Sequence, residues 1–171
     1  TRVSHDLGDG AYARRRKGCE TAAAALGLRA LRDLPYDGLG AALDRLPDEE
    51  QRCLVRHVVT ENRRVGEVTA KLRAGRIREI GPLLSEGHAS LRDDFKVSCP
   101  ELDLVVDTAL AAGALGARMT GGGFGGSAIV LVEEDGAEAI GEEITRAFGQ
   151  AGHRAPRVFP AAASAGAQRI A

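Results

Sequence analysis

The sequence predicts an α+β domain, in which several helices accompany a small, largely antiparallel sheet. Up to about residue 112, apolar residues recur at intervals of three and four, as on one face of a helix. Beyond it, two short β-type segments flank a run of glycines, and one more helix and a last β-type segment follow. Helices first and strands afterwards, with no internal repeat, favour α+β over an alternating parallel fold.

The first half of the chain predicts three helices. An apolar stripe at 8–26 stops at Gly27, while prolines and glycines break 28–47 into short helices and turns. Stripes at 54–72 and 77–91 are joined by a short link at Ala74 and Gly75, which predicts an antiparallel helical hairpin. Pro82 would kink the second of these helices or mark a late start.

Local signals order the second half. Ser98 followed by Glu101 has the capping-box spacing, so we expect a helix that begins with Pro100 in its first turn and stops at Gly113. Strands are predicted at 117–120, 127–132 and 157–159, with a helix at 137–148.

Composition narrows the class of protein. A length of 171 residues allows one domain, or one half of a larger enzyme, and the opening on Thr1 rather than Met predicts a chain whose N-terminal part is missing. A net charge of -1 gives no general attraction to nucleic acid, and no apolar run predicts a membrane span. The basic run at 14–17 is interpreted as a solvated helix face. Three scattered cysteines indicate neither a metal site nor a disulfide framework and favour a reducing cytoplasm.

The strongest local signal is the glycine-rich segment 121–126, called the glycine turn below. Its glycines can take up positive φ and bring bare backbone close to a ligand, and successive N–H groups there can bind an anion. A flexible hairpin loop explains the composition equally well. The segment matches neither the phosphate loop of nucleotide-binding proteins nor the dinucleotide fingerprint. It consists of Gly121, Gly122, Gly123, Phe124, Gly125 and Gly126.

Few ionisable residues fall on apolar stripes. Glu61 and His88 do, and they would form a site pair or, as the favoured interpretation, close buried hydrogen bonds between the two hairpin helices. Asp93 and Asp94 are expected to end or cap a helix. Tyr12, near a helix start, offers both a ring and a hydroxyl, and the residues alone favour core packing.

Longer motifs resemble a family. The segment 116–127, GARMTGGGFGGS, is similar to the third signature motif of the GHMP small-molecule kinases in its galactokinase form. The segments 1–7, 56–62, 85–95, 97–103 and 164–167 support the resemblance, which covers essentially the whole chain. Ser127 and Phe95 stand where Cys and Tyr are common in the family.

The resemblance implies a GHMP kinase C-terminal domain over 1–171, with helices packed on one side of a small, largely antiparallel, ferredoxin-like sheet. A galactokinase phosphorylates the 1-hydroxyl of galactose with ATP and Mg²⁺, in a cleft between two domains. Tyr12 would contact the sugar, and the glycine turn would support the phosphate-binding loop of the other domain. His88, Ser90, Asp93 and Asp94 would mainly hold helices and the turn in place.

The family's phosphate loop, catalytic aspartate and sugar-binding acid are absent from this sequence. No catalytic residue or metal ligand is therefore assigned to the chain, and we expect it to be inactive and prone to self-association without an N-terminal domain that binds ATP and galactose. Three alternatives remain open. The chain would belong to a sugar- and ATP-binding regulatory protein, to another GHMP sugar kinase, or to a free-standing α+β ligand-binding or interaction module.

Overall fold

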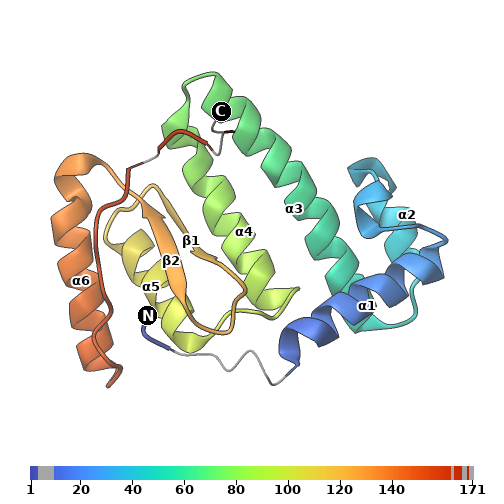
Figure 1. Cartoon of the computed structure of the whole chain (residues 1–171), viewed down its shortest axis with the longest axis horizontal. Helices are drawn as coiled ribbons and strands as arrows, with labels where there is room; N and C mark the ends of the chain where they lie inside the picture. Colours follow the sequence, from blue (N-terminus) through green and yellow to red (C-terminus); the bar gives the residue numbers. More distant parts are fainter. Residues whose placement is uncertain (4–9, 163, 167–168, 170–171) are drawn as a thin grey trace.

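Helices α1 to α6 and one β-hairpin make up the described part of the chain (Figure 1). The computed structural model describes residues 1–3, 10–162, 164–166 and 169. The α-helices and strands are α1 (Ala11–Leu26), α2 (Leu39–Asp44), α3 (Glu49–Arg73), α4 (Gly81–Asp93), α5 (Pro100–Ala111), β1 (Gly116–Thr120), β2 (Ser127–Leu131) and α6 (Ala137–Gln150). Short 3₁₀ helices lie at Leu31–Asp33, Tyr36–Gly38, Ile77–Ile80 and Glu134–Gly136.

Local chemistry sets most helix ends where the sequence predicts them. Gly27 ends α1 in a left-handed conformation with φ 73°, and residues 8 and 9 of the predicted helix lie outside the described residues. The Asp48 side chain accepts a 2.8 Å hydrogen bond from the backbone N–H of Gln51 at the start of α3. Pro82 lies in the first turn of α4, behind a 3₁₀ turn, which confirms the late start.

The capping box predicted for α5 does not form. Cys99, not Ser98, is the N-cap residue, and no side chain caps the helix. The Ser98 hydroxyl instead donates a 2.5 Å hydrogen bond to Asp103 Oδ1. The bond to the Asp103 carboxylate is stronger than a capping bond between the Ser98 hydroxyl and a backbone N–H would be, because hydrogen bonds to charged groups are stronger than those between neutral groups.

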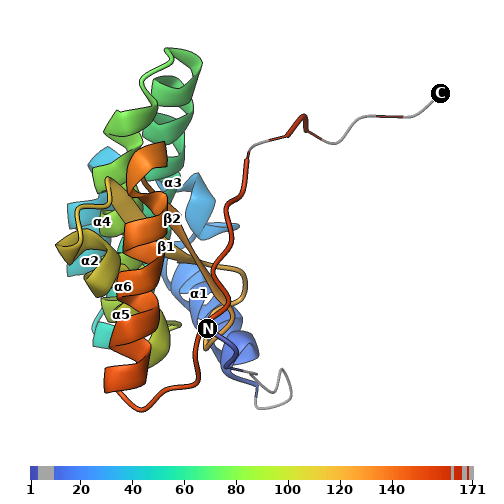
Figure 2. The same ribbon diagram turned by 90° about the vertical axis from the view of Figure 1, so that its left-hand side faces the viewer.

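The sheet consists, among the described residues, of β1 and β2 in antiparallel register, with Gly116 opposite Leu131 and Thr120 opposite Ser127. Helix α5 covers one face of the hairpin, while the segment 153–162 runs along the other side (Figure 2). This confirms the α+β class with helices on one side of a small antiparallel sheet.

The third strand predicted at 157–159 is wrong, because 153–162 has no regular secondary structure. Pro156 and Pro160 bracket the segment, and proline supplies no N–H to a ladder. Val158 instead packs on α6, where a Cβ on Gly141 would approach its Cγ1 to 3.1 Å.

Two apolar cores lie at opposite ends of the fold, and the α3–α4 pair connects them (Figure 1). The first core joins α1, α2 and the N-terminal half of α3 around Leu26 and Val59. The second joins α5, α6 and the hairpin around Phe148. A smaller cluster of Val97, Leu102 and Met119 lies under the glycine turn. Helices α3 and α4 pack side by side, as the predicted hairpin requires.

Candidate functional site

The glycine turn connects β1 to β2 and has a fixed base and an open rim. At the base, the Phe124 N–H donates a 2.6 Å hydrogen bond to the Val97 carbonyl. A Cβ on Gly123, whose φ is 86°, would stand 2.5 Å from the same carbonyl oxygen. At Gly121, Gly122 and Gly126 nothing else lies within 4 Å of an added Cβ. A ligand or another polypeptide could therefore approach the backbone of Gly121 and Gly122 closely, whereas Val3 lies against Gly125 and Thr1 against the Gly126 carbonyl.

The start of α1 lies at the same end of the molecule as the glycine turn, in both ribbon views (Figures 1 and 2). Tyr12 lies in the first turn of α1 and is 61% exposed, so the core-packing interpretation is wrong. Thr1 also lies against the turn, since its Oγ1 donates a 3.0 Å hydrogen bond to the Gly126 carbonyl. The end of the molecule that carries the turn thus also carries the first turn of α1 with the exposed Tyr12.

Polar side chains of α4 close the outer edge of β1. The N–H groups of Ala117 and Met119 point away from β2, and each donates a 3.2 Å hydrogen bond, to Ser85 Oγ and His88 Nδ1 respectively. Because Nδ1 of His88 accepts, its proton resides on Nε2, which lies 3.1 Å from Asp103 Oδ1. Burial lowers the pKa of His88, although Asp103 opposes the shift. His88 is therefore a neutral link between α4, β1 and α5.

Glu61 makes its ion pairs elsewhere. Its carboxylate lies 2.7 Å from Arg118 Nη1 on β1 and 2.5 Å from Arg64 Nη1 on α3. Burial alone would raise the pKa of Glu61, but hydrogen bonds and charge from the two arginines lower it. Glu61 and His88 thus form no site pair, and the prediction that they bond the two hairpin helices to each other is wrong: both bond to the strand that follows. Sequence spacing could not reveal this, because Arg118 is 57 positions from Glu61.

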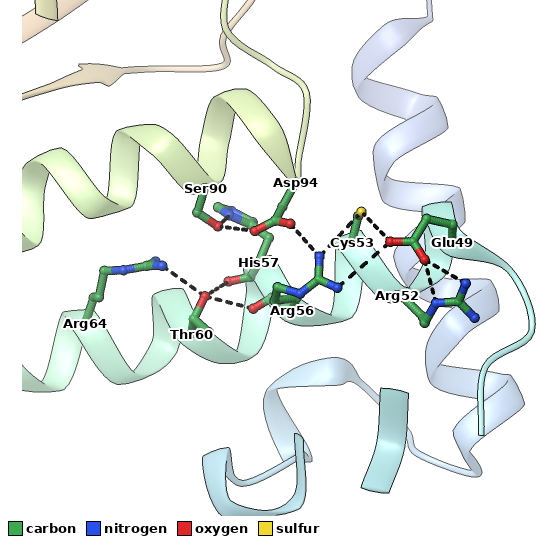
Figure 3. A network of polar contacts seen from close by, with 9 residues as sticks. All are labelled: Glu49, Arg52, Cys53, Arg56, His57, Thr60, Arg64, Ser90 and Asp94. Carbon is green, nitrogen blue, oxygen red and sulfur yellow. Dashed lines mark hydrogen bonds and ion pairs between the residues drawn. The ribbon is translucent and has the colours of Figure 1, made fainter. Parts of the chain in front are cut away.

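A second buried histidine, His57, joins α3 to the end of α4 (Figure 3). Ser90 Oγ donates to Asp94 Oδ2 over 3.0 Å and accepts from His57 Nδ1 over 3.0 Å. Asp94 Oδ1 in turn accepts from Arg56 Nη1 over 2.7 Å. Burial lowers the pKa of His57 to about 4, and its ring stacks on Phe95 with a 4.4 Å centroid separation.

This network explains the paired aspartates. Asp94 is the C-cap residue of α4 and bonds Arg56, whereas Asp93 faces solvent and pairs with Arg92. The two aspartates therefore bind different partners, as expected of adjacent residues at a helix end. His57 itself gave no separate signal in the sequence beyond lying within the motif 56–62.

The described residues provide no metal site, because no group of three His, Cys, Asp or Glu side chains converges among them. Two shallow grooves lie elsewhere: one is between α5 and α6 near Thr108 and Ile140, and the other is beside α1 near Cys19 and Leu31. Neither includes Tyr12 or the glycine turn. Across the same residues, no helix has both the length and the apolar character to cross a membrane.

The chain is similar to known proteins along almost all of its length. Residues 68–150 match the family model "GHMP kinases C terminal". Galactokinase from Streptomyces coelicolor is 65% identical over 99% of this chain and 44% of its own length, and that from Streptomyces lividans is 61% identical over 98% and 42%. A crystal structure of Lactococcus lactis galactokinase complexed with galactose superimposes with a TM-score of 0.85 at 34% identity, over 91% of this chain and 42% of that one.

The chain thus spans less than half the length of the galactokinases that it matches. The match runs along almost all of this chain, and the solved relative has the same fold. Residues 68–150 accordingly match the model of the C-terminal domain of GHMP kinases, and the chain as a whole is homologous to the C-terminal part of galactokinases.

Proposed function

We propose that this chain acts as the C-terminal part of a galactokinase, which transfers the γ-phosphoryl group of ATP to the 1-hydroxyl of galactose in the cytoplasm. The observation that carries the proposal is the glycine turn, whose base is fixed to Val97 and whose rim is open at the end of the molecule where α1 begins. Homology to galactokinases over almost the whole chain supports the proposed reaction and sugar.

The chain's part in this reaction is to position the reactants. Phosphoryl transfer depends on aligned reactants and stabilised charge more than on covalent chemistry by the protein. Tyr12 would donate its exposed hydroxyl to a sugar oxygen. The glycine turn would hold the phosphate-binding backbone of a preceding domain against ATP. Mg²⁺ would neutralise phosphate charge, and we expect that domain to supply its protein ligands.

A chimera tests the proposal. The matched C-terminal part of Streptomyces coelicolor galactokinase is replaced by this chain, and ATP-dependent formation of galactose 1-phosphate is measured. We expect turnover by the chimera and none above background by the chain alone. A chimera that folds and binds both ligands without turnover would support the regulatory alternative. Preference for another sugar in a substrate panel would support a different GHMP sugar kinase.

Two variants of the chimera separate the two roles. Gly123→Val should lower kcat about 100-fold or more, because a β-branched residue fits a φ of 86° poorly and its Cβ would meet the Val97 carbonyl. Tyr12→Phe should instead raise KM for galactose about tenfold through loss of one hydrogen bond. Gly66→Ala, within α3, is the folding control, since its added methyl meets nothing within 4 Å. Unchanged kcat in Gly123→Val would remove the turn from the mechanism.

A further inference from the structure

Backbone strain concentrates at one hydrogen bond. Apart from Arg2 near the chain start, the non-glycine residues with positive φ among those described are Lys96, at 55°, and Phe124, at 61°. They lie on the two sides of the hydrogen bond from the Phe124 N–H to the Val97 carbonyl. A left-handed non-glycine residue costs roughly 1–3 kcal/mol, so both conformations need support from their surroundings.

The segment 96–98 supplies the fixed side of this bond. Val97 is 2% exposed, and its own N–H donates a 3.0 Å hydrogen bond to the Leu91 carbonyl near the end of α4. Its side chain packs with Leu102 and Met119 in the cluster beneath the glycine turn. Both polar groups of the Val97 backbone are thus engaged, and the left-handed turn at Lys96 aims the carbonyl at Phe124.

Asp103 holds the neighbouring residue of that segment. A single oxygen, Oδ1, accepts the Ser98 hydroxyl at 2.5 Å and faces His88 Nε2 at 3.1 Å. His88 in turn accepts the Met119 N–H, and the Met119 side chain lies under the turn, with its Cε 3.2 Å from a Cβ placed on Gly123. One carboxylate on α5 therefore reaches the base of the glycine turn by two routes, through Ser98 and through His88.

We propose that Asp103 is a positioning residue for the glycine turn: through Ser98 and His88 it fixes the Val97 carbonyl and Met119, and so sets the turn's height and conformation for phosphoryl transfer. The inference rests on the proposed function only in its last step, because the geometric step concerns this chain alone. Asp103 touches no reactant. Its role differs from that of the Glu61–Arg118 pair, which bonds β1 to α3.

Amide hydrogen exchange in the chain itself tests the geometric step. Asp103→Ala removes the shared acceptor, and we expect the Phe124 and Met119 amides to exchange about tenfold faster or more, with amides of α1 and α2 unchanged. Asp103→Asn keeps an uncharged acceptor and should restore most of the protection. Asp107→Ala, an exposed site one turn further along α5, is the control and should leave both amides at the native rate. Equal Phe124 exchange in Asp103→Ala and Asp107→Ala would overturn the inference.

Turnover in the chimera tests the last step. Asp103→Ala should lower kcat about tenfold while KM for galactose stays within about twofold, and Asp103→Asn should recover part of the loss. A purely structural role would lower the melting temperature without this split, and a kcat equal to that of Asp107→Ala would overturn the role in catalysis. If the unaltered chimera is inactive while the exchange result holds, the proposed function fails and the positioning of the turn stands. Ser98→Ala, which removes one route alone, gives the same test in milder form if Asp103→Ala does not fold.

Discussion

His57 and His88 are both neutral in the folded chain, His88 because its Nδ1 accepts a hydrogen bond and His57 because burial lowers its pKa to about 4. His88 accepts a backbone N–H at Nδ1, and His57 donates from Nδ1 to a serine whose own hydrogen goes to Asp94. Charging either ring would add a proton to a desolvated site, and for His88 it would also oppose the bond from Met119. These residues therefore act as hydrogen-bonding links. Their protonation at low pH should lower the free energy of unfolding.

The pH dependence of stability follows from the pKa of His57. The unfolded side chain takes up a proton near pH 6.5, whereas the folded one resists until about pH 4. Between these values the unfolded state binds more protons, so the free energy of unfolding falls as the pH drops from 6.5 toward 4 and is unaffected by this group above 6.5. The full loss is about 3 kcal/mol.

Urea denaturation at pH 7.5 and pH 4.5 measures this loss. His57→Gln should be less stable than the native chain at pH 7.5, and it should lose less stability on acidification. His88, whose pKa is also lowered, keeps contributing in the variant. An identical acid-induced loss in the two proteins would show that His57 does not titrate in the predicted window.

At the scale of elements, helix α4 and strand β1 approach so closely that their backbones touch. Gly81 at the start of α4 faces Leu115 and Gly116, and a Cβ on either glycine would overlap a backbone carbonyl of the other element. The close approach brings Ser85 and His88 within reach of the edge of β1, where they accept its outward N–H groups. A covered edge also keeps the hairpin from pairing with other strands.

Two glycine substitutions test this contact. Gly81→Ala should lower the free energy of unfolding by about 3 kcal/mol, because the added methyl meets backbone that cannot turn aside. Gly66→Ala, within α3, meets nothing within 4 Å and should raise stability by up to about 1 kcal/mol through helix propensity. Urea unfolding compares the two, and a neutral Gly81→Ala would mean that α4 and β1 lie further apart.

The elements that the sequence predicts correctly are those that depend on local signals. Helical periodicity and proline placement located α3, α4 and α5, because those signals are local. The predicted strand at 157–159 is wrong because prolines flank the segment, and the predicted cap at Ser98 is wrong because the Ser98 hydroxyl bonds to Asp103. Glu61 and His88 stood out as polar residues on apolar stripes, but their partners lie 57 and 31 positions away, which no spacing rule connects.

On the scale of the whole molecule, a polar layer connects two apolar cores. Leu26 and Val59 belong to the core of α1 to α3, and Phe148 belongs to the core of α5, α6 and the hairpin. The links between them include the His57–Ser90–Asp94 network and the pair of Glu61 with Arg118. The two cores share no residue, so we expect each core to open as its own cooperative unit.

Hydrogen exchange followed by mass spectrometry tests the division. Leu26→Ala should remove about 2–4 kcal/mol from the first core, so that peptides of α1 and α2 exchange about 100-fold faster while those of α6 change little. Phe148→Ala should show the reverse pattern. Equal acceleration of all peptides by both variants would mean that the polar layer couples the cores into one unit.

The division into two cores matters for the candidate site because Tyr12 lies on α1 and the glycine turn joins β1 to β2. Because the α3–α4 pair connects the two cores, we expect it to set the distance between the proposed sugar contact and the proposed phosphate-facing turn.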